Sequence, residues 1–184
     1  MVMATRGFFY RQTPNLITGL RILMVPLVLF LVLDQWETFW GRFSALVLLV
    51  LAASTDGIDG AIARRRNLIT NLGKILDPIA DKALLSGALV VLSIQDAVPW
   101  WATIAILVRE FGITVYRLVV AKKRVIAASG GGKFKTVMQI IAVSMALAPF
   151  DWFQPFWGIL TQALIVFTVG LTWWTGLAYL RPAK

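Results

Sequence analysis

The chain is built from long apolar runs separated by short polar segments. Six runs are visible, each about as long as the 20 residues that a helix needs to cross a bilayer. Backbone groups in lipid must find their hydrogen bonds within the segment, so runs of this length predict helices and not strands. The sequence therefore predicts an all-α integral membrane protein with six transmembrane helices, forming one domain over residues 1–184; the expected spans are 16–33, 43–62, 78–95, 99–121, 134–150 and 155–180.

Composition agrees with this prediction. Of the 184 residues, 59% are hydrophobic, whereas soluble domains have roughly 45–50%. The connections between the runs are too short to hold a separate soluble domain. Before Pro14, residues 3–12 mix basic and aromatic side chains, which predicts a short helix lying on the membrane surface.

The positive charge is distributed unevenly along the chain. The net charge is +9, and lysines and arginines gather in alternate connections and near both ends of the chain. This is the positive-inside pattern, and it places both termini and the connection between the second and third spans on the cytoplasmic side of the cell membrane. Basic residues there meet anionic lipid headgroups, which explains the charge without nucleic acid, and no nucleic-acid partner is expected.

Cysteine and histidine are both absent from the sequence. Disulfide bonds and thiolate metal sites are therefore excluded. A general base that acts near neutral pH must be a carboxylate, a lysine or a tyrosine.

Four of the nine acidic residues lie close together, at Asp56, Asp59, Asp77 and Asp81. Carboxylates at membrane depth are costly and indicate function. Four of them in one pocket repel each other unless cations neutralise the charge. Oxygen ligands without Cys or His favour Mg²⁺ or Mn²⁺ over zinc, and two such ions would balance four carboxylates.

Helical spacing places these aspartates in pairs. Asp56 and Asp59 share one helix face, and Asp77 and Asp81 share another. We expect a connection of about ten residues, from Arg66 to Leu76, which would make the two helices antiparallel neighbours with the pairs facing each other.

Two glycines and an arginine accompany the aspartates. Gly60 and Gly73 remove side chains where a ligand would approach, although glycines also serve close helix packing in membranes. Arg64 lies about 7.5 Å of helix rise beyond Asp59, where its guanidinium can bind a phosphate oxygen; Arg65 and Arg66 are interpreted as a topogenic basic run.

Residues 56–81 fit the pattern D-x2-D-G-x2-A-R-x8-G-x3-D-x3-D at all eight fixed positions. The chain thereby resembles the CDP-alcohol phosphatidyltransferases. The resemblance implies transfer of a phosphatidyl group from CDP-diacylglycerol to an alcohol with release of CMP. It also implies a homodimer, with Asp56, Asp59, Asp77 and Asp81 as metal ligands and Asp81 also as the catalytic base.

A further stretch and one threonine extend the resemblance toward the donor. Thr70, six residues past Arg64, matches a family threonine near the donor phosphates, although it also fits an ordinary loop hydroxyl. Pro14 to Arg21 matches the P-N-x-x-T-x-x-R element of the family, whose Asn-to-Thr stretch contacts the nucleotide. Asn15 and Thr18 also fit an ordinary helix start. The residues expected to bind CDP-diacylglycerol are Asn15, Leu16, Ile17, Thr18, Gly60, Arg64, Thr70 and Gly73.

Basic residues in the fourth span and at the start of the fifth indicate which kind of alcohol accepts the phosphatidyl group. Arg109, Arg117, Lys133 and Lys135 can converge on an anion, which implies an acceptor with its own phosphate. An internal Arg109–Glu110 pair is the structural alternative, although adjacent helical residues do not face each other. The run from Ser129 to Gly132, with its three glycines, suggests a mobile lid over this pocket.

The same residues resemble the branch of the family that makes phosphatidylglycerol phosphate, through R-E and G-K-x-K-T-x-x-Q elements, the latter ending at Gln139. The implied acceptor is glycerol 3-phosphate, while the last two spans carry no specific signal beyond residue 140. Inositol phosphate needs the same cationic pocket, and a neutral acceptor such as serine would leave it unused. A divalent-cation transporter, a prenyl-diphosphate enzyme and a purely structural anchor are distant alternatives.

Overall fold

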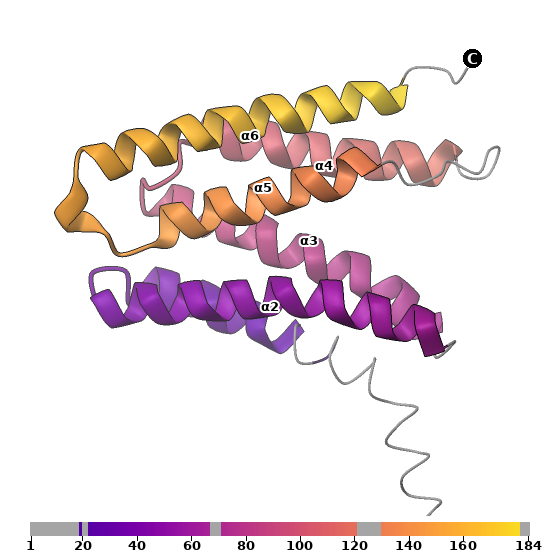
Figure 1. Ribbon diagram of the computed structural model, residues 1–184, viewed down its shortest axis with the longest axis horizontal. Coiled ribbons are helices and arrows are strands. Elements are labelled where there is room, and N and C mark those ends of the chain that lie inside the picture. The colour runs from indigo at the N-terminus through magenta and orange to yellow at the C-terminus, as the bar shows by residue number, and fades with distance from the viewer. Residues whose placement is uncertain (1–18, 20–21, 67–70, 121–129, 181–184) are drawn as a thin grey trace, which may run out of the picture. The chain divides into compact units, whose positions relative to one another are not determined.

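The computed structural model describes residue 19 and residues 22–66, 71–120 and 130–180, with side chains described for residue 19 and for 22–54, 82–116 and 134–177. Every regular element in these ranges is a helix, which confirms the all-α prediction (Figure 1). The elements are a helix at Ile22–Asp34, then α2 (Phe39–Arg66), α3 (Asn71–Ile94), α4 (Trp100–Val120), α5 (Gly130–Leu147), the 3₁₀ helix η1 (Asp151–Phe153) and α6 (Phe156–Leu180).

Two connections are shorter than the sequence predicted. The expected ten-residue connection after Arg66 is wrong, because α3 already begins at Asn71. Gly73 therefore lies in the first turn of α3 and not in a loop. The expected lid at glycines 130–132 is also wrong, because α5 begins at Gly130. The surface helix predicted for residues 3–12 lies outside the described residues.

The chain divides into two compact units, residues 1–88 and 89–184. In unit 1 the buried side chains of α2 follow helical spacing at Ala45, Leu49 and Ala52. The helix at Ile22–Asp34 packs closely on α3 in this unit, because a Cβ at Gly87 would lie 3.0 Å from Leu29 Cδ2.

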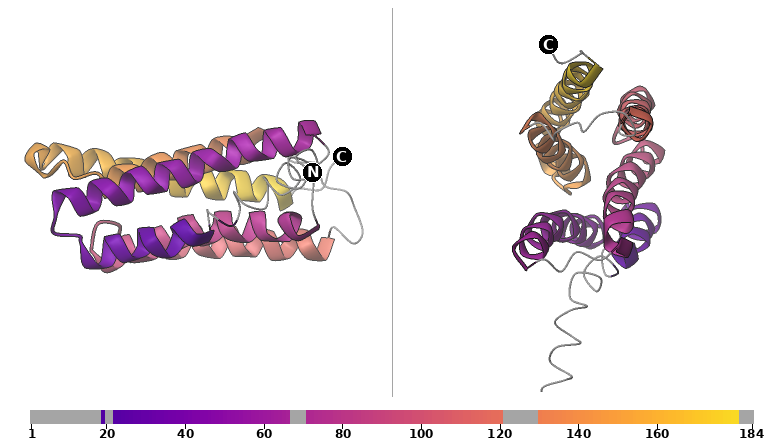
Figure 2. Two further views of the ribbon diagram at one scale, coloured as in Figure 1. Left: turned by 90° about the horizontal axis from the view of Figure 1, so that it is seen from below. Right: turned by 90° about the vertical axis from the view of Figure 1, so that its right-hand side faces the viewer.

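Unit 2 contains the end of α3 together with α4, α5, η1 and α6. Helix α6 contacts both α4 and α5, and Figure 2 shows these helices running alongside one another. The inward face of α6 is a stripe of hydroxyl side chains at Thr161, Thr168 and Thr172, interrupted by Ile165. Its outward face is strongly apolar, with Phe156 67% and Trp174 76% exposed.

This arrangement reverses the pattern of a helix on a soluble protein, whose apolar stripe faces the core. It is the arrangement expected where lipid surrounds the protein and small or hydroxyl side chains lie between helices. Residues Phe156–Leu177 of α6 form the one segment, within the described parts, that is long and apolar enough to cross a membrane, with a mean hydropathy of 1.6.

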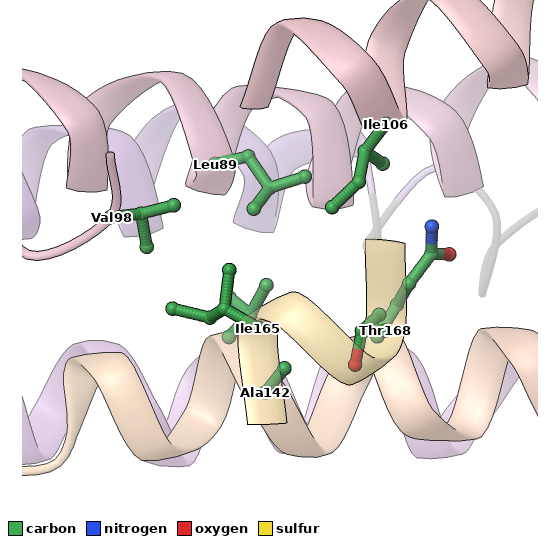
Figure 3. Close-up of a pocket in the computed structure, with 8 residues that line it drawn as sticks. Leu89, Val98, Ile106, Ala142, Ile165 and Thr168 are labelled. Carbon is green, nitrogen blue, oxygen red and sulfur yellow. The ribbon is translucent and has the colours of Figure 1, made fainter. Parts of the chain in front are cut away.

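A small cavity of about 10 Å³ lies in the centre of unit 2. Leu89, Val98 and Ile106 face Ile165 and Thr168 across it (Figure 3). The Oγ1 of Thr168 is buried and has no hydrogen-bond partner among the described residues. By contrast, the buried hydroxyl of Thr103 lies 2.6 Å from Ser93 Oγ.

These two buried threonines should respond differently to the same substitution. Thr103→Val leaves Ser93 without its partner and should cost about 1–3 kcal/mol of unfolding free energy. Thr168→Val removes a hydroxyl that has no such partner and should be neutral or stabilising. Thermal unfolding of both variants in detergent measures the difference, and equal losses would contradict the hydrogen-bond assignment.

Candidate functional site

The four aspartates of the sequence pattern lie on two successive helices of unit 1. Asp56 and Asp59 lie three residues apart in α2, while Asp77 and Asp81 lie four apart in α3. Both spacings place the members of a pair on one helix face. Their side chains lie outside the described part of the chain, so the meeting of the two pairs stays a prediction.

This donor set fits a hard divalent cation, because it consists of carboxylates in a chain without Cys or His. Among the side chains that the structure describes, no group of three or more potential metal ligands gathers elsewhere. The aspartate pattern on α2 and α3 stays the predicted metal centre, on the chemistry of its four carboxylates.

The predicted donor-binding residues are placed only in part. Gly60 and Arg64 lie within α2, and Gly73 lies within α3, each with its backbone in a helix. The remaining five lie outside the described residues: Asn15, Leu16, Ile17, Thr18 and Thr70. Their contact with the donor stays a prediction.

A cluster of polar side chains joins the three helices α4, α5 and α6 of unit 2. At its centre is the carboxylate of Glu110 on α4, whose side chain is 18% exposed. One oxygen, Oε1, forms an ion pair with Lys135 Nζ of α5 and another with Arg109 Nη1 at 3.0 Å. Gln139 Nε2 donates to the same oxygen at 3.4 Å.

The guanidinium of Arg109 is buried between α4 and α6, with only 6% of the side chain exposed. Its Nη2 donates to Thr175 Oγ1 at 3.1 Å. Its Nε has no hydrogen-bond partner among the described residues. The side chain also lies against Gly176, where an added Cβ would come within 2.8 Å of Nε.

The structure thus brings together two of the four predicted acceptor residues, Arg109 and Lys135, on a single carboxylate. Arg117 lies on α4 and Lys133 on α5, but their side chains are not described, so the convergence of all four cations stays a prediction. The argument against an Arg109–Glu110 pair is wrong, because Arg109 Nη1 and Glu110 Oε1 form an ion pair at 3.0 Å.

Several members of the cluster were not among the predicted site residues: Glu110, Gln139, Thr172, Thr175 and Gly176. Gln139 lies four residues after Lys135, and this spacing alone could have placed it on the same face of α5. The α6 residues had no comparable signal, because threonine and glycine are common in apolar helices. Gln139 of α5 connects Glu110 of α4 with α6, because its Nε2 also lies 3.5 Å from Thr172 Oγ1.

Comparison with known proteins identifies the family. The sequence profile of the CDP-alcohol phosphatidyltransferase family matches residues 11–174. A CDP-diacylglycerol--glycerol-3-phosphate 3-phosphatidyltransferase of Bacillus subtilis (strain 168) is 40% identical over 177 residues, covering 87% of this chain and 91% of that protein. The Escherichia coli (strain K12) protein of the same name is 34% identical over 178 residues, covering 93% and 94%.

A probable phosphatidylglycerophosphate synthase of Mycobacterium tuberculosis (strain ATCC 25618 / H37Rv) is 41% identical over 142 residues, covering 73% of this chain and 65% of that protein. The profile and these relatives confirm the family that the sequence resembles. The chain belongs to the CDP-alcohol phosphatidyltransferase family.

Proposed function

We propose that this phosphatidyltransferase moves the phosphatidyl group of CDP-diacylglycerol onto glycerol 3-phosphate, giving phosphatidylglycerol phosphate and CMP. The family supplies the reaction class. The names of the relatives in Bacillus subtilis and Escherichia coli support this donor and this acceptor.

The observation that supports a phosphorylated acceptor is that two cationic side chains contact the same carboxylate. Arg109 and Lys135 are buried side chains on different helices, and both contact Glu110 Oε1. The two side chains thereby place a guanidinium and an ammonium group beside one another, and these are the groups with which proteins bind phosphate. A phosphate group on the acceptor suits this pair of cations, whereas a neutral alcohol does not.

The chain's own residues can carry out the transfer. The hydroxyl oxygen of the acceptor attacks the phosphorus of the phosphatidyl group, and the bond from that phosphorus to the bridging oxygen breaks. The hydroxyl proton passes to the carboxylate of Asp81 as the base, and CMP leaves. Arg64 binds a donor phosphate oxygen, while the other donor residues of the pattern hold the nucleotide.

We further propose that Asp56, Asp59, Asp77 and Asp81 hold two Mg²⁺ or Mn²⁺ ions. When bound, these ions would withdraw charge from the pyrophosphate of the donor and stabilise the leaving CMP. The support is the donor set of four carboxylates in two helical pairs.

A membrane location with six transmembrane helices is part of the same proposal. The apolar outer face of α6 supports it, and so do shorter apolar helices at Ile22–Asp34, Phe39–Ser54, Lys82–Ile94 and Phe134–Leu147. The positive-inside pattern supports placing both termini and the aspartates on the cytoplasmic side. We also propose a single functional domain and a homodimer, as the resemblance implies.

Release of CMP by the purified protein tests the proposed acceptor. CDP-diacylglycerol and Mg²⁺ are supplied with glycerol 3-phosphate, inositol phosphate, serine or no acceptor, and EDTA replaces Mg²⁺ in a parallel reaction. We expect CMP release only in the reaction that contains both glycerol 3-phosphate and Mg²⁺. Release with inositol phosphate alone would keep the chemistry and refute the acceptor, and full activity in EDTA would refute the metals.

Asp81→Asn tests the catalytic base. Turnover should fall at least about a hundredfold, because the amide cannot accept the proton, while binding of CDP measured by titration calorimetry stays close to that of the wild type. Asp96→Asn is the matched control, since Asp96 is exposed and its φ of 58° is one that Asn tolerates. Unchanged turnover in Asp81→Asn would remove Asp81 from this role.

Lys135→Ala tests the cationic pocket. The KM for glycerol 3-phosphate should rise by about tenfold or more, because a charge-assisted contact to the phosphate is lost. The KM for CDP-diacylglycerol should change much less. Arg42→Ala removes a cation that lies over the Trp36 ring in unit 1 and should alter neither constant. An equal rise in both constants for Lys135→Ala would count against the pocket.

A further inference from the structure

The side of Arg109 opposite its own helix is held by two consecutive residues of α6. Thr175 Oγ1 accepts a hydrogen bond from Arg109 Nη2 at 3.1 Å. The same hydroxyl lies 2.9 Å from Leu171 O and 3.0 Å from Thr172 O, to which it can donate its proton. The proton is thereby turned toward the helix backbone, and a lone pair of Oγ1 is left for the guanidinium.

Gly176 provides the space in which the guanidinium lies. A Cβ at this position would lie 2.8 Å from Arg109 Nε, 3.4 Å from Cγ and 3.5 Å from Cζ. All three nearest atoms belong to Arg109, so this glycine accommodates one side chain rather than a neighbouring helix backbone. Gly170, on the same helix, would meet nothing within 4 Å.

These contacts extend from α6 to both predicted acceptor cations. Thr175 and Gly176 hold Arg109, Arg109 contacts Glu110 Oε1, and Lys135 contacts the same oxygen. A shift of the guanidinium would therefore move the carboxylate that also orients the ammonium group. A purely structural buried arginine is expected to have its donors satisfied, yet Nε of Arg109 has no partner among the described residues.

We propose that Thr175 and Gly176 are positioning residues for the phosphorylated acceptor. They hold Arg109 directly, and they hold Lys135 through Glu110. In these positions both cations bind the phosphate of the acceptor. This inference rests on the proposed function. It assigns a role in acceptor binding to α6, the helix whose sequence gave no signal of one.

Four single variants of the full-length protein test the inference. Thr175→Val removes the hydroxyl oxygen that accepts the hydrogen bond from Arg109 and keeps the shape of the side chain. Thr175→Ser keeps this oxygen. Gly176→Ala places a methyl group against the guanidinium, and Gly170→Ala adds the same methyl group to the same helix where space is open. Rates of CMP release are measured against glycerol 3-phosphate and, separately, against CDP-diacylglycerol.

Thr175→Val and Gly176→Ala should each raise the KM for glycerol 3-phosphate by about tenfold and change the KM for CDP-diacylglycerol by less than about twofold. Thr175→Ser and Gly170→Ala should match the wild type in both constants. A merely structural role would lower activity without separating the two constants, and it would not depend on the hydroxyl oxygen. If Gly176→Ala fails to fold, the comparison of Thr175→Val with Thr175→Ser decides alone.

The wild-type protein separates the two ways of failing. If the wild type uses glycerol 3-phosphate but Thr175→Val keeps the normal KM for it, the positioning role is overturned and the proposed function stands. An equal rise in the KM values for glycerol 3-phosphate and CDP-diacylglycerol in Thr175→Val would also overturn the positioning role and leave the proposed function standing. If the wild type releases CMP with no phosphorylated acceptor, the proposed function is overturned, and the positioning role with it.

Discussion

The arrangement of unit 2 depends on the ion pairs and the hydrogen bond that the carboxylate of Glu110 forms. One of its oxygens receives the guanidinium of Arg109, the ammonium of Lys135 and the amide of Gln139, so a single group joins α4 to α5. Arg109 then extends the connection to α6 through Thr175. Buried charges are stable only when they are paired and hydrogen-bonded, which makes the positions of these three helices and of the cations interdependent.

The same cluster accounts for two of the hydroxyl groups on α6, those of Thr172 and Thr175. Apolar side chains gain nothing by leaving lipid for the protein interior, so packing and hydrogen bonds must hold helices together in a membrane. Thr172 accepts a hydrogen bond from Gln139 of α5 and Thr175 accepts one from Arg109 of α4, while Gly176 lets the Arg109 side chain approach α6 closely. The anchoring of Arg109, a predicted acceptor cation, and the contacts between the helices thus rely on the same residues.

The sequence predicted the order and approximate bounds of the helices because long apolar runs are a strong signal. It failed at the polar start of α3, which begins at Asn71 and not after Leu76. Charged and polar residues there were interpreted as a loop, although helices extend readily beyond the hydrocarbon region. The glycines that begin α5 at Gly130 were misinterpreted for a similar reason: flexibility of a residue type does not decide the local structure.

The candidate site was predictable to different extents. The aspartate pattern was clear because its spacing is fixed, and its three-dimensional arrangement remains a prediction. Arg109 and Lys135 were found because charges in apolar segments are conspicuous. The pairing of Arg109 with Glu110 was considered as an alternative and wrongly argued against, because helical periodicity describes Cβ directions and not the reach of long side chains. The proposed role of Thr175 depends on a contact across 66 residues of sequence, which no local pattern encodes.

Direct titration of glycerol 3-phosphate into the purified protein, with Mg²⁺ and CMP present and glycerol as the uncharged counterpart, tests the central claim. That claim is that Arg109 and Lys135, joined by Glu110, form a site for the phosphate of the acceptor. Saturable binding of glycerol 3-phosphate without binding of glycerol is the predicted result. Equal binding of both compounds, or binding of glycerol 3-phosphate that persists when Arg109 and Lys135 are both replaced, would contradict it.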